Sequence, residues 1–151
     1  MTREEQEKEI REFLQDKLDI YSKNALYIEA FTHDAGDFKD PKNKTNQRLA
    51  YLGDMVVNFS FANHAFLQYP DYDKGQLTEE CKTPRSDPKL AEAFIRLGLT
   101  DNYIIKPPKQ VYVDGEFTVR AKVVEALFGA IYLDQGFEKA RALAEKHLLQ
   151  P

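Results

Sequence analysis

The stretch that decides the fold runs from Asn46 to Phe66 and reads NQRLAYLGDMVVNFSFANHAF. Its apolar residues recur at the spacing of one long helix and predict a broad apolar surface, made of Leu49, Leu52, Val56, Val57, Phe59 and Phe61. A separate stripe, at spacings of three and four, holds Gln47, Ala50, Asp54 and Asn58. We expect this helix to continue to about Gln68, because Tyr69-Pro70 ends it.

Gly53 and Asp54 are unusual residues for the middle of such a helix. A carboxylate with apolar residues on either side must be paired, hydrated or bound to a metal, because burying an isolated charge is costly. A glycine inside a helix costs about 1 kcal/mol relative to alanine. The pair therefore predicts that another part of the molecule comes close to the backbone of Gly53.

Length and composition favour one domain spanning residues 1–151. The hydrophobic content of 42% is enough for a core, and no run approaches the roughly 18 apolar residues of a membrane span. The charged first residues do not resemble a signal peptide, and Cys81 has no second cysteine to pair with, which favours a reducing, cytoplasmic location. The net charge of −4 argues against a general-purpose nucleic-acid binder, although a small basic patch or an acidic metal site is compatible with it.

The rest of the chain also has helical periodicity. Further helices are expected over residues 3–21, 24–34, 77–82, 87–97, 118–134 and 137–149. Residues 99–117 leave two alternatives open, a β-hairpin that turns at Asp114-Gly115 or a surface loop. The sequence thus predicts an all-α domain of about six or seven helices.

Two of the expected helices each carry one acid among apolar residues, Asp54 and Glu125. If these helices pack face to face, the two carboxylates converge and offer the oxygen ligands that Mg²⁺ and Mn²⁺ prefer. A metal bound there activates water and stabilises the charge of a phosphoryl displacement. The plainer alternative is that Glu125 pairs with Lys122, three residues earlier on the same helix.

Four motifs resemble the ribonuclease III family. NQRLAYLGDMVV is similar to its signature helix N-E-R-L-E-F-L-G-D-x-V-L, and AKVVEALFGAIYLDQG is similar to its later A-D-x-x-E-A-x-x-G-A-x-Y-L-D-x-G. EAFTHDAGD at residues 29–37 resembles the family's A-L-T-H-x-S-Y element. GQLT at residues 75–78, followed by KLAEAFIRLGL at 89–99, resembles the G-x-L-T and L-A-x-x-A-x-x-L-G-L elements. The motifs occur in family order and cover most of the chain.

The resemblance implies an all-α endonuclease domain that forms a homodimer with a cleft for double-stranded RNA. Members of the family hydrolyse phosphodiesters during RNA processing with a Mg²⁺-activated water, and they leave 5′-phosphate and 3′-hydroxyl ends. Transferred to the matching positions, the resemblance implies that Asp54 and Glu125 are the catalytic, metal-binding acids. It also implies that Tyr51 is the aromatic residue that inserts into the partner subunit.

Three positions depart from the family pattern. Gln47 and Ala50 replace acids of the signature helix, and Lys122 replaces the aspartate three residues before Glu125. An ammonium group near a metal site either repels the cation or takes over part of its electrostatic role. The Mini-ribonuclease III branch has a similar LAYxGD segment with alanine at the same place, but THDAGD and YLDQG are more similar to the ordinary branch.

Two main hypotheses follow, and a purely structural helical protein is a third. The first is a metal-dependent endoribonuclease acting on double-stranded RNA. The second is a protein of the same fold, catalytically inactive by nature or by engineering, that binds structured RNA or assembles with a partner. We expect no double-stranded-RNA-binding domain in this chain, so an accessory RNA-binding protein is among the expected partners. The basic residues expected to contact phosphates are Lys42, Lys44, Arg48, Lys82 and Arg85.

Overall fold

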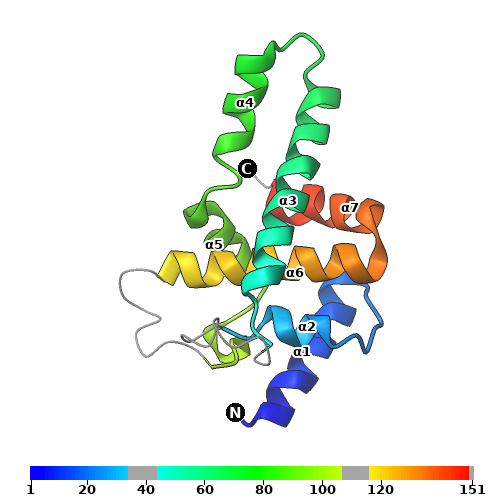
Figure 1. The fold of residues 1–151 in the computed structure, drawn as a ribbon, viewed down its shortest axis with the longest axis vertical. Helices are drawn as coiled ribbons and strands as arrows, with labels where there is room; N and C mark the ends of the chain where they lie inside the picture. Colours follow the sequence, from blue (N-terminus) through cyan, green and yellow to red (C-terminus); the bar gives the residue numbers. More distant parts are fainter. Residues whose placement is uncertain (34–43, 107–115, 150–151) are drawn as a thin grey trace.

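Two long helices that cross each other, α3 (Gln47–Gln68) and α6 (Glu116–Gln135), form the centre of the molecule (Figure 1). The structure is a computed structural model, and it describes residues 1–33, 44–106 and 116–149. The other helices are α1 (Arg3–Leu18), α2 (Leu26–Ala30), α4 (Lys74–Lys82), α5 (Asp87–Arg96), the 3₁₀ helix η2 (Asp101–Tyr103) and α7 (Phe137–Leu148).

The prediction of an all-α fold with six or seven helices is confirmed within the described residues. The only β-type pairing there is a single bridge between Thr32 and Ile105. The choice between a hairpin and a loop concerned residues 107–115 above all, and these lie outside the described ranges. Among the helices of the described part, none is long and apolar enough to span a membrane.

Helix α6 forms the middle of the core. Nearly every residue from Ala121 to Ile131 is buried, and α3, α5, α2 and α7 pack around the helix. Such a helix is apolar on almost every side, which is typical of a helix surrounded by others. The side chains that form the rest of the core come from all the neighbouring helices except α4, which contributes no buried residue.

Polar contacts fix α6 near both ends. Near its start, the guanidinium group of Arg120 donates two hydrogen bonds to the carboxylate of Asp101 in η2, at 3.0 and 2.9 Å. At its end, Asp134 accepts hydrogen bonds from the hydroxyl of Tyr27 at 2.7 Å and from the amide of Asn24 at 3.1 Å. These contacts set the position of α6 along its axis, and therefore the position of the side chains in its middle.

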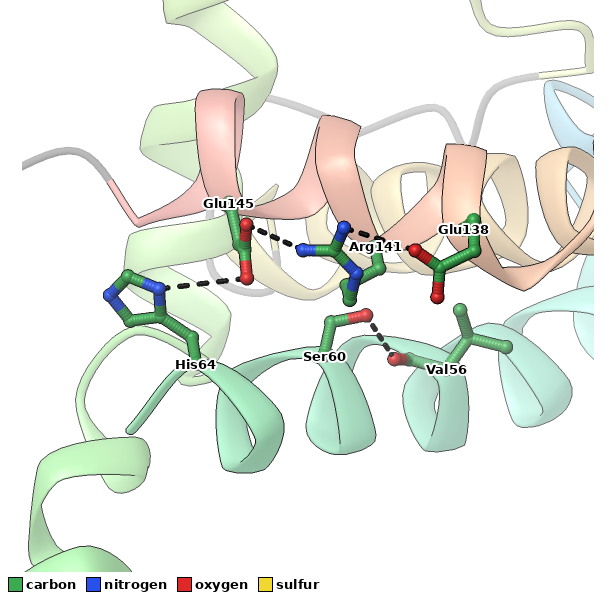
Figure 2. A network of polar contacts seen from close by, with 6 residues as sticks. All are labelled: Val56, Ser60, His64, Glu138, Arg141 and Glu145. Atoms are coloured by element: carbon green, nitrogen blue, oxygen red, sulfur yellow. Dashed lines mark hydrogen bonds and ion pairs between the residues drawn. The ribbon is translucent and has the colours of Figure 1, made fainter. Parts of the chain in front are cut away.

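Polar side chains on α7 contact α3 in the network shown in Figure 2. Arg141 donates hydrogen bonds to Glu145 at 2.8 Å and to Glu138 at 3.1 Å. The other carboxylate oxygen of Glu145 lies 3.6 Å from Nδ1 of His64 on α3. Beyond this point α3 and α4 project from the body of the molecule as a helical hairpin (Figure 1).

The structure corrects the predicted apolar faces at several positions. Phe59 was expected on the apolar surface of α3, but its side chain is 61% exposed and stacks on Phe137 at a centroid distance of 5.0 Å. Tyr21 does not extend the first helix, because α1 ends at Leu18 and Asp19 adopts a left-handed conformation. Ile95 and Leu133 are also exposed, although each shares a helix with core residues. Periodicity identified these helices correctly and overestimated the width of their buried faces.

The predicted close approach at Gly53 is confirmed. A Cβ atom at Gly53 would overlap the carbonyl oxygen of Glu125 and lie 2.9 Å from the backbone nitrogen of Gly129. A Cβ atom at Gly129 would in turn overlap the carbonyl oxygen of Leu49 and lie 3.2 Å from the nitrogen of Gly53. The two helices thus touch backbone to backbone, which only glycine at both positions permits.

We expect Gly53→Ala to destabilise the protein by about 3 kcal/mol, because the added methyl group forces apart two backbones that cannot yield without moving the core. Urea denaturation of the wild-type and variant proteins measures this loss. Gly75→Ala is the matched control, since its added Cβ would have a nearest contact of 3.4 Å, and it should be neutral or slightly stabilising. A Gly53→Ala protein as stable as the Gly75→Ala protein would contradict the proposed crossing.

Candidate active site

The helix crossing brings together the two acids singled out in the sequence. Asp54 follows Gly53 on α3, and the backbone of Glu125 on α6 is the group that Gly53 contacts most closely. The side chains of Asp54 and Glu125 are hydrogen-bonded to each other, and both are half-buried. Two carboxyl groups can make this contact only when a proton or a cation lies between them.

The pKa of Glu125 shows how strongly this environment disfavours a second negative charge. Burial, followed by the hydrogen bond to Asp54 and the charge of Asp54, raises this pKa from 4.5 to about 8. The charge of Asp87 raises it further, while the charge of Lys122 acts in the opposite direction. Burial and the neighbouring acids therefore favour the protonated form of Glu125 over its ionised form.

These residues fit a divalent ion held by two carboxylates. Mg²⁺ typically binds through one or two carboxylates and completes its shell with water and substrate phosphates. A cation held by Asp54 and Glu125 would relieve the repulsion that raises the pKa of Glu125. Within the described ranges there is no group of three or more ligating side chains, so the chain does not form an all-protein metal cage there.

The three departed positions have different surroundings. Gln47 is exposed on the first turn of α3. Ala50 is 7% exposed and belongs to the hydrophobic core. Lys122 is half-buried and lies one turn before Glu125 on α6. Of the three, only Lys122 has an influence on the acid pair that the structure records, namely the lowering of the Glu125 pKa.

Asp87 also acts on the acid pair, although the sequence predicts only a helix start at this residue. It is the first residue of α5. Because α5 packs on α6, its charge reaches Glu125 and raises the pKa of that residue. No local motif marks this role, since it depends on how α5 and α6 pack.

Asn58 and Arg85 line a groove beside α3, the helix that carries Asp54. This groove, between α3 and α4, has a volume of about 540 Å³ and is lined by Asn58, Ala62, Phe66, Lys74, Leu77, Thr78, Cys81 and Arg85. The side-chain oxygen of Asn58 is buried and has no hydrogen-bond partner among the described residues. The groove is mainly apolar, with basic side chains in its lining.

The basic residues proposed for phosphate contacts do not form one cluster in the described structure. Lys44 and Arg48 are exposed near the start of α3, whereas Arg85 lies beyond α4. Lys82 forms an ion pair with Glu79 at 2.7 Å. Lys42 lies outside the described residues. These residues remain predictions. Lys44 and Arg48 lie near the start of α3 and Arg85 lies beyond α4, which suits an extended ligand better than a small one.

Tyr51 is not an ordinary core aromatic, because its side chain is 74% exposed. Met55, Phe59 and Phe66 are also exposed and follow Tyr51 along one side of α3. These four residues form an exposed apolar stripe, which we call the α3 stripe. Apolar surface of this extent on one helix is typical of a protein interface.

Comparisons with known proteins agree with this architecture. The family model described as ribonuclease-III-like matches residues 23–151. Ribonuclease 3 of Pelotomaculum thermopropionicum is 34% identical over 139 residues, which cover 89% of this chain and 58% of that protein. Ribonuclease 3 of Mycoplasmopsis synoviae is 33% identical over 145 residues, covering 94% of this chain and 62% of that protein. The chain therefore spans little more than half the length of these relatives.

Solved structures show the same fold. The nuclease domain of ribonuclease III from Campylobacter jejuni superposes with a TM-score of 0.77 at 26% identity, over 91% of this chain and 94% of that one. A second structure of that domain gives a TM-score of 0.74 at 27% identity. The all-α fold is thus the nuclease-domain fold of ribonuclease III. The chain belongs to the ribonuclease-III-like family.

Replacing Glu125 by glutamine should change how stability depends on pH. Because the folded protein holds the proton with a pKa of about 8 and the unfolded chain releases it near 4.5, wild-type stability should fall as pH rises from about 5 to 8. Glutamine stays neutral, so Glu125→Gln should lack this fall. We expect it to exceed the wild type at pH 9 by a free energy of unfolding on the order of 2 kcal/mol, and to match it at pH 5.

Urea denaturation at pH 5, 7 and 9 in chelator-containing buffer measures this difference. Glu4→Gln on the exposed side of α1 is the matched control and should parallel the wild type throughout. A Glu125→Gln protein whose stability also runs parallel to the wild type would show that Glu125 is ionised in the folded protein at neutral pH.

Proposed function

We propose that this chain is a metal-dependent endoribonuclease domain that cleaves double-stranded RNA during RNA processing. The observation that carries the proposal is the Asp54–Glu125 pair, which the glycine crossing of α3 and α6 holds in contact. Membership of the ribonuclease-III-like family supports the same activity. The proposed products carry 5′-phosphate and 3′-hydroxyl ends.

Asp54 and Glu125 are the residues that would hold Mg²⁺ or Mn²⁺. When bound, such an ion supplies a nucleophile for hydrolysis and stabilises negative charge on the phosphoryl oxygens. The chain places these two carboxylates on α3 and α6, whose relative position is fixed by the backbone contact at Gly53 and Gly129. Glu125 would hold a cation in its deprotonated form, so metal binding should be favoured by rising pH.

We further propose that the active form is a homodimer that uses the α3 stripe. The stripe is apolar, exposed and adjacent to the α3–α4 groove, so a second copy related by two-fold symmetry could bury both. A structure of the Campylobacter jejuni nuclease domain is described by its flexibility in a region involved in dimer formation. In this proposal Tyr51 of each copy enters the apolar groove of the other.

Double-stranded RNA would bind along the dimer through shape and phosphate contacts. Lys44 just before α3, Arg48 on its first turn, and Arg85 in the turn between α4 and α5 are all exposed. Because the net charge is −4, these local cations must supply the attraction against an overall repulsion. An accessory RNA-binding protein would add the RNA affinity that the negative net charge of this chain opposes.

A second candidate function is supported by a specific observation. Ala50 is part of the hydrophobic core and Lys122 stands beside the acid pair, so neither position supplies the acid of the family pattern. A protein with this site could bind structured RNA or assemble with a partner without cutting. Binding without cleavage would distinguish this function from the first.

The test of the proposed activity is cleavage of a long double-stranded RNA with Mg²⁺ or Mn²⁺. The wild type should cut it, and Glu125→Gln should lower the rate by about 100-fold or more, because the pair loses a ligand while its hydrogen bond is preserved. Glu4→Gln should cut like the wild type. RNA binding without metal-dependent cleavage in the wild type would favour the second candidate function.

The proposed interface is tested by Tyr51→Ala in sedimentation equilibrium. We expect the variant to dissociate at concentrations where the wild type is a dimer, because a buried interface aromatic is commonly worth about 2 kcal/mol or more. Tyr21→Ala is the matched control, since Tyr21 is equally exposed but lies in the connection between α1 and α2. Equal dimerisation of both variants would exclude the α3 stripe as the interface.

A further inference from the structure

Lys122 is placed so that its charge acts on the two acids of the proposed site. It precedes Glu125 by three residues on α6, and residues at this spacing lie on the same side of a helix. The crossing at Gly53 puts Asp54 against that turn of α6. The lysine side chain is half-buried, so solvent screens its charge less than that of a surface lysine. Its effect on the pKa of Glu125 agrees with this placement.

The charge of the site differs strongly from that of the family pattern described above. Lysine in place of aspartate changes the charge by two units, and alanine in place of glutamate changes it by one. With both carboxylates ionised, positions 50, 54, 122 and 125 together carry one negative charge, instead of the four that the family pattern would carry at these positions. A divalent ion is attracted by the two carboxylates and repelled by the ammonium.

We propose that Lys122 sets the divalent-metal affinity of this site by serving as the resident counter-ion of Asp54 and Glu125. A divalent ion that binds the two carboxylates must compete with the ammonium group for them. The metal affinity of this chain is therefore low, and it is limited by a single side chain outside the ligand pair. This inference rests on the metal site of the proposed function, but it does not depend on RNA cleavage.

Binding of Mn²⁺ alone, without RNA, tests the inference. Electron paramagnetic resonance of the free ion gives the affinity for the wild type, Lys122→Gln and Lys122→Asp. We expect Lys122→Asp to bind Mn²⁺ at least about tenfold more tightly than the wild type, because it replaces a repelling charge by an attracting one. Lys122→Gln, which only removes the repulsion, should lie between them.

Lys23→Asp provides the matched control. It makes the same change of net charge at an exposed lysine between α1 and α2, and it should leave Mn²⁺ affinity close to that of the wild type. Adding Glu125→Gln to Lys122→Asp should abolish the gain, which assigns the tighter binding to this site. Circular dichroism tests whether each variant is folded. If Lys122→Asp is not folded, the Mn²⁺ affinity of Lys122→Gln is compared with the wild type instead.

The outcomes separate this inference from the proposed function. If Lys122→Asp binds Mn²⁺ no more tightly than Lys23→Asp, the role of Lys122 is overturned. Where Lys122→Asp does not fold, the same comparison is made between Lys122→Gln and Lys23→Asp. Absence of Mn²⁺ binding in every variant would overturn both the metal site and the inference. Tighter binding by Lys122→Asp, together with a wild type that does not cleave RNA, would support the inference and count against the proposed activity.

Discussion

The structure depends on the contact between the backbones of α3 and α6 at Gly53 and Gly129. Helices in globular proteins usually pack with axes 8–10 Å apart, because side chains separate them. Here a Cβ atom at either glycine would overlap a carbonyl oxygen of the opposite helix. Each glycine weakens its own helix by about 1 kcal/mol. That local loss is offset by the apolar surface that the closer packing buries around α6.

The same contact creates the electrostatics of the candidate site. Asp54 directly follows one of the two glycines, and Glu125 provides the carbonyl group that the glycine touches. The crossing holds the two carboxyl groups near each other, so the repulsion between them is relieved by a proton, by Lys122 or by a cation. The close packing of α3 and α6 thereby creates a site that favours binding of a cation. The fixed ends of α6, at Arg120 and Asp134, keep this arrangement in register.

The sequence predicted the parts of this arrangement that depend on local pattern. A glycine beside an acid in mid-helix indicated a close approach at Gly53, and helical periodicity located α3 and α6 nearly to their ends. What it could not predict depends on the neighbours of each helix. Phe59 has the spacing of a core residue but emerges beside α7, where it stacks on Phe137. Asp87 looks like an ordinary helix start until α5 is placed against α6.

The two halves of α3 differ in how much of their surface is packed against the rest of the molecule. Up to Ala65 the helix is fixed by the core and by the contact between His64 and Glu145 (Figure 2). Beyond it, Phe66 is 68% exposed and α4 has no buried residue. A helical hairpin with so little buried surface gains stability mainly from whatever packs on it. The α3 stripe continues from Tyr51 to Phe66 in this hairpin. A partner that covers the stripe would therefore stabilise the hairpin, and the same contact would shield one side of the acid pair from solvent.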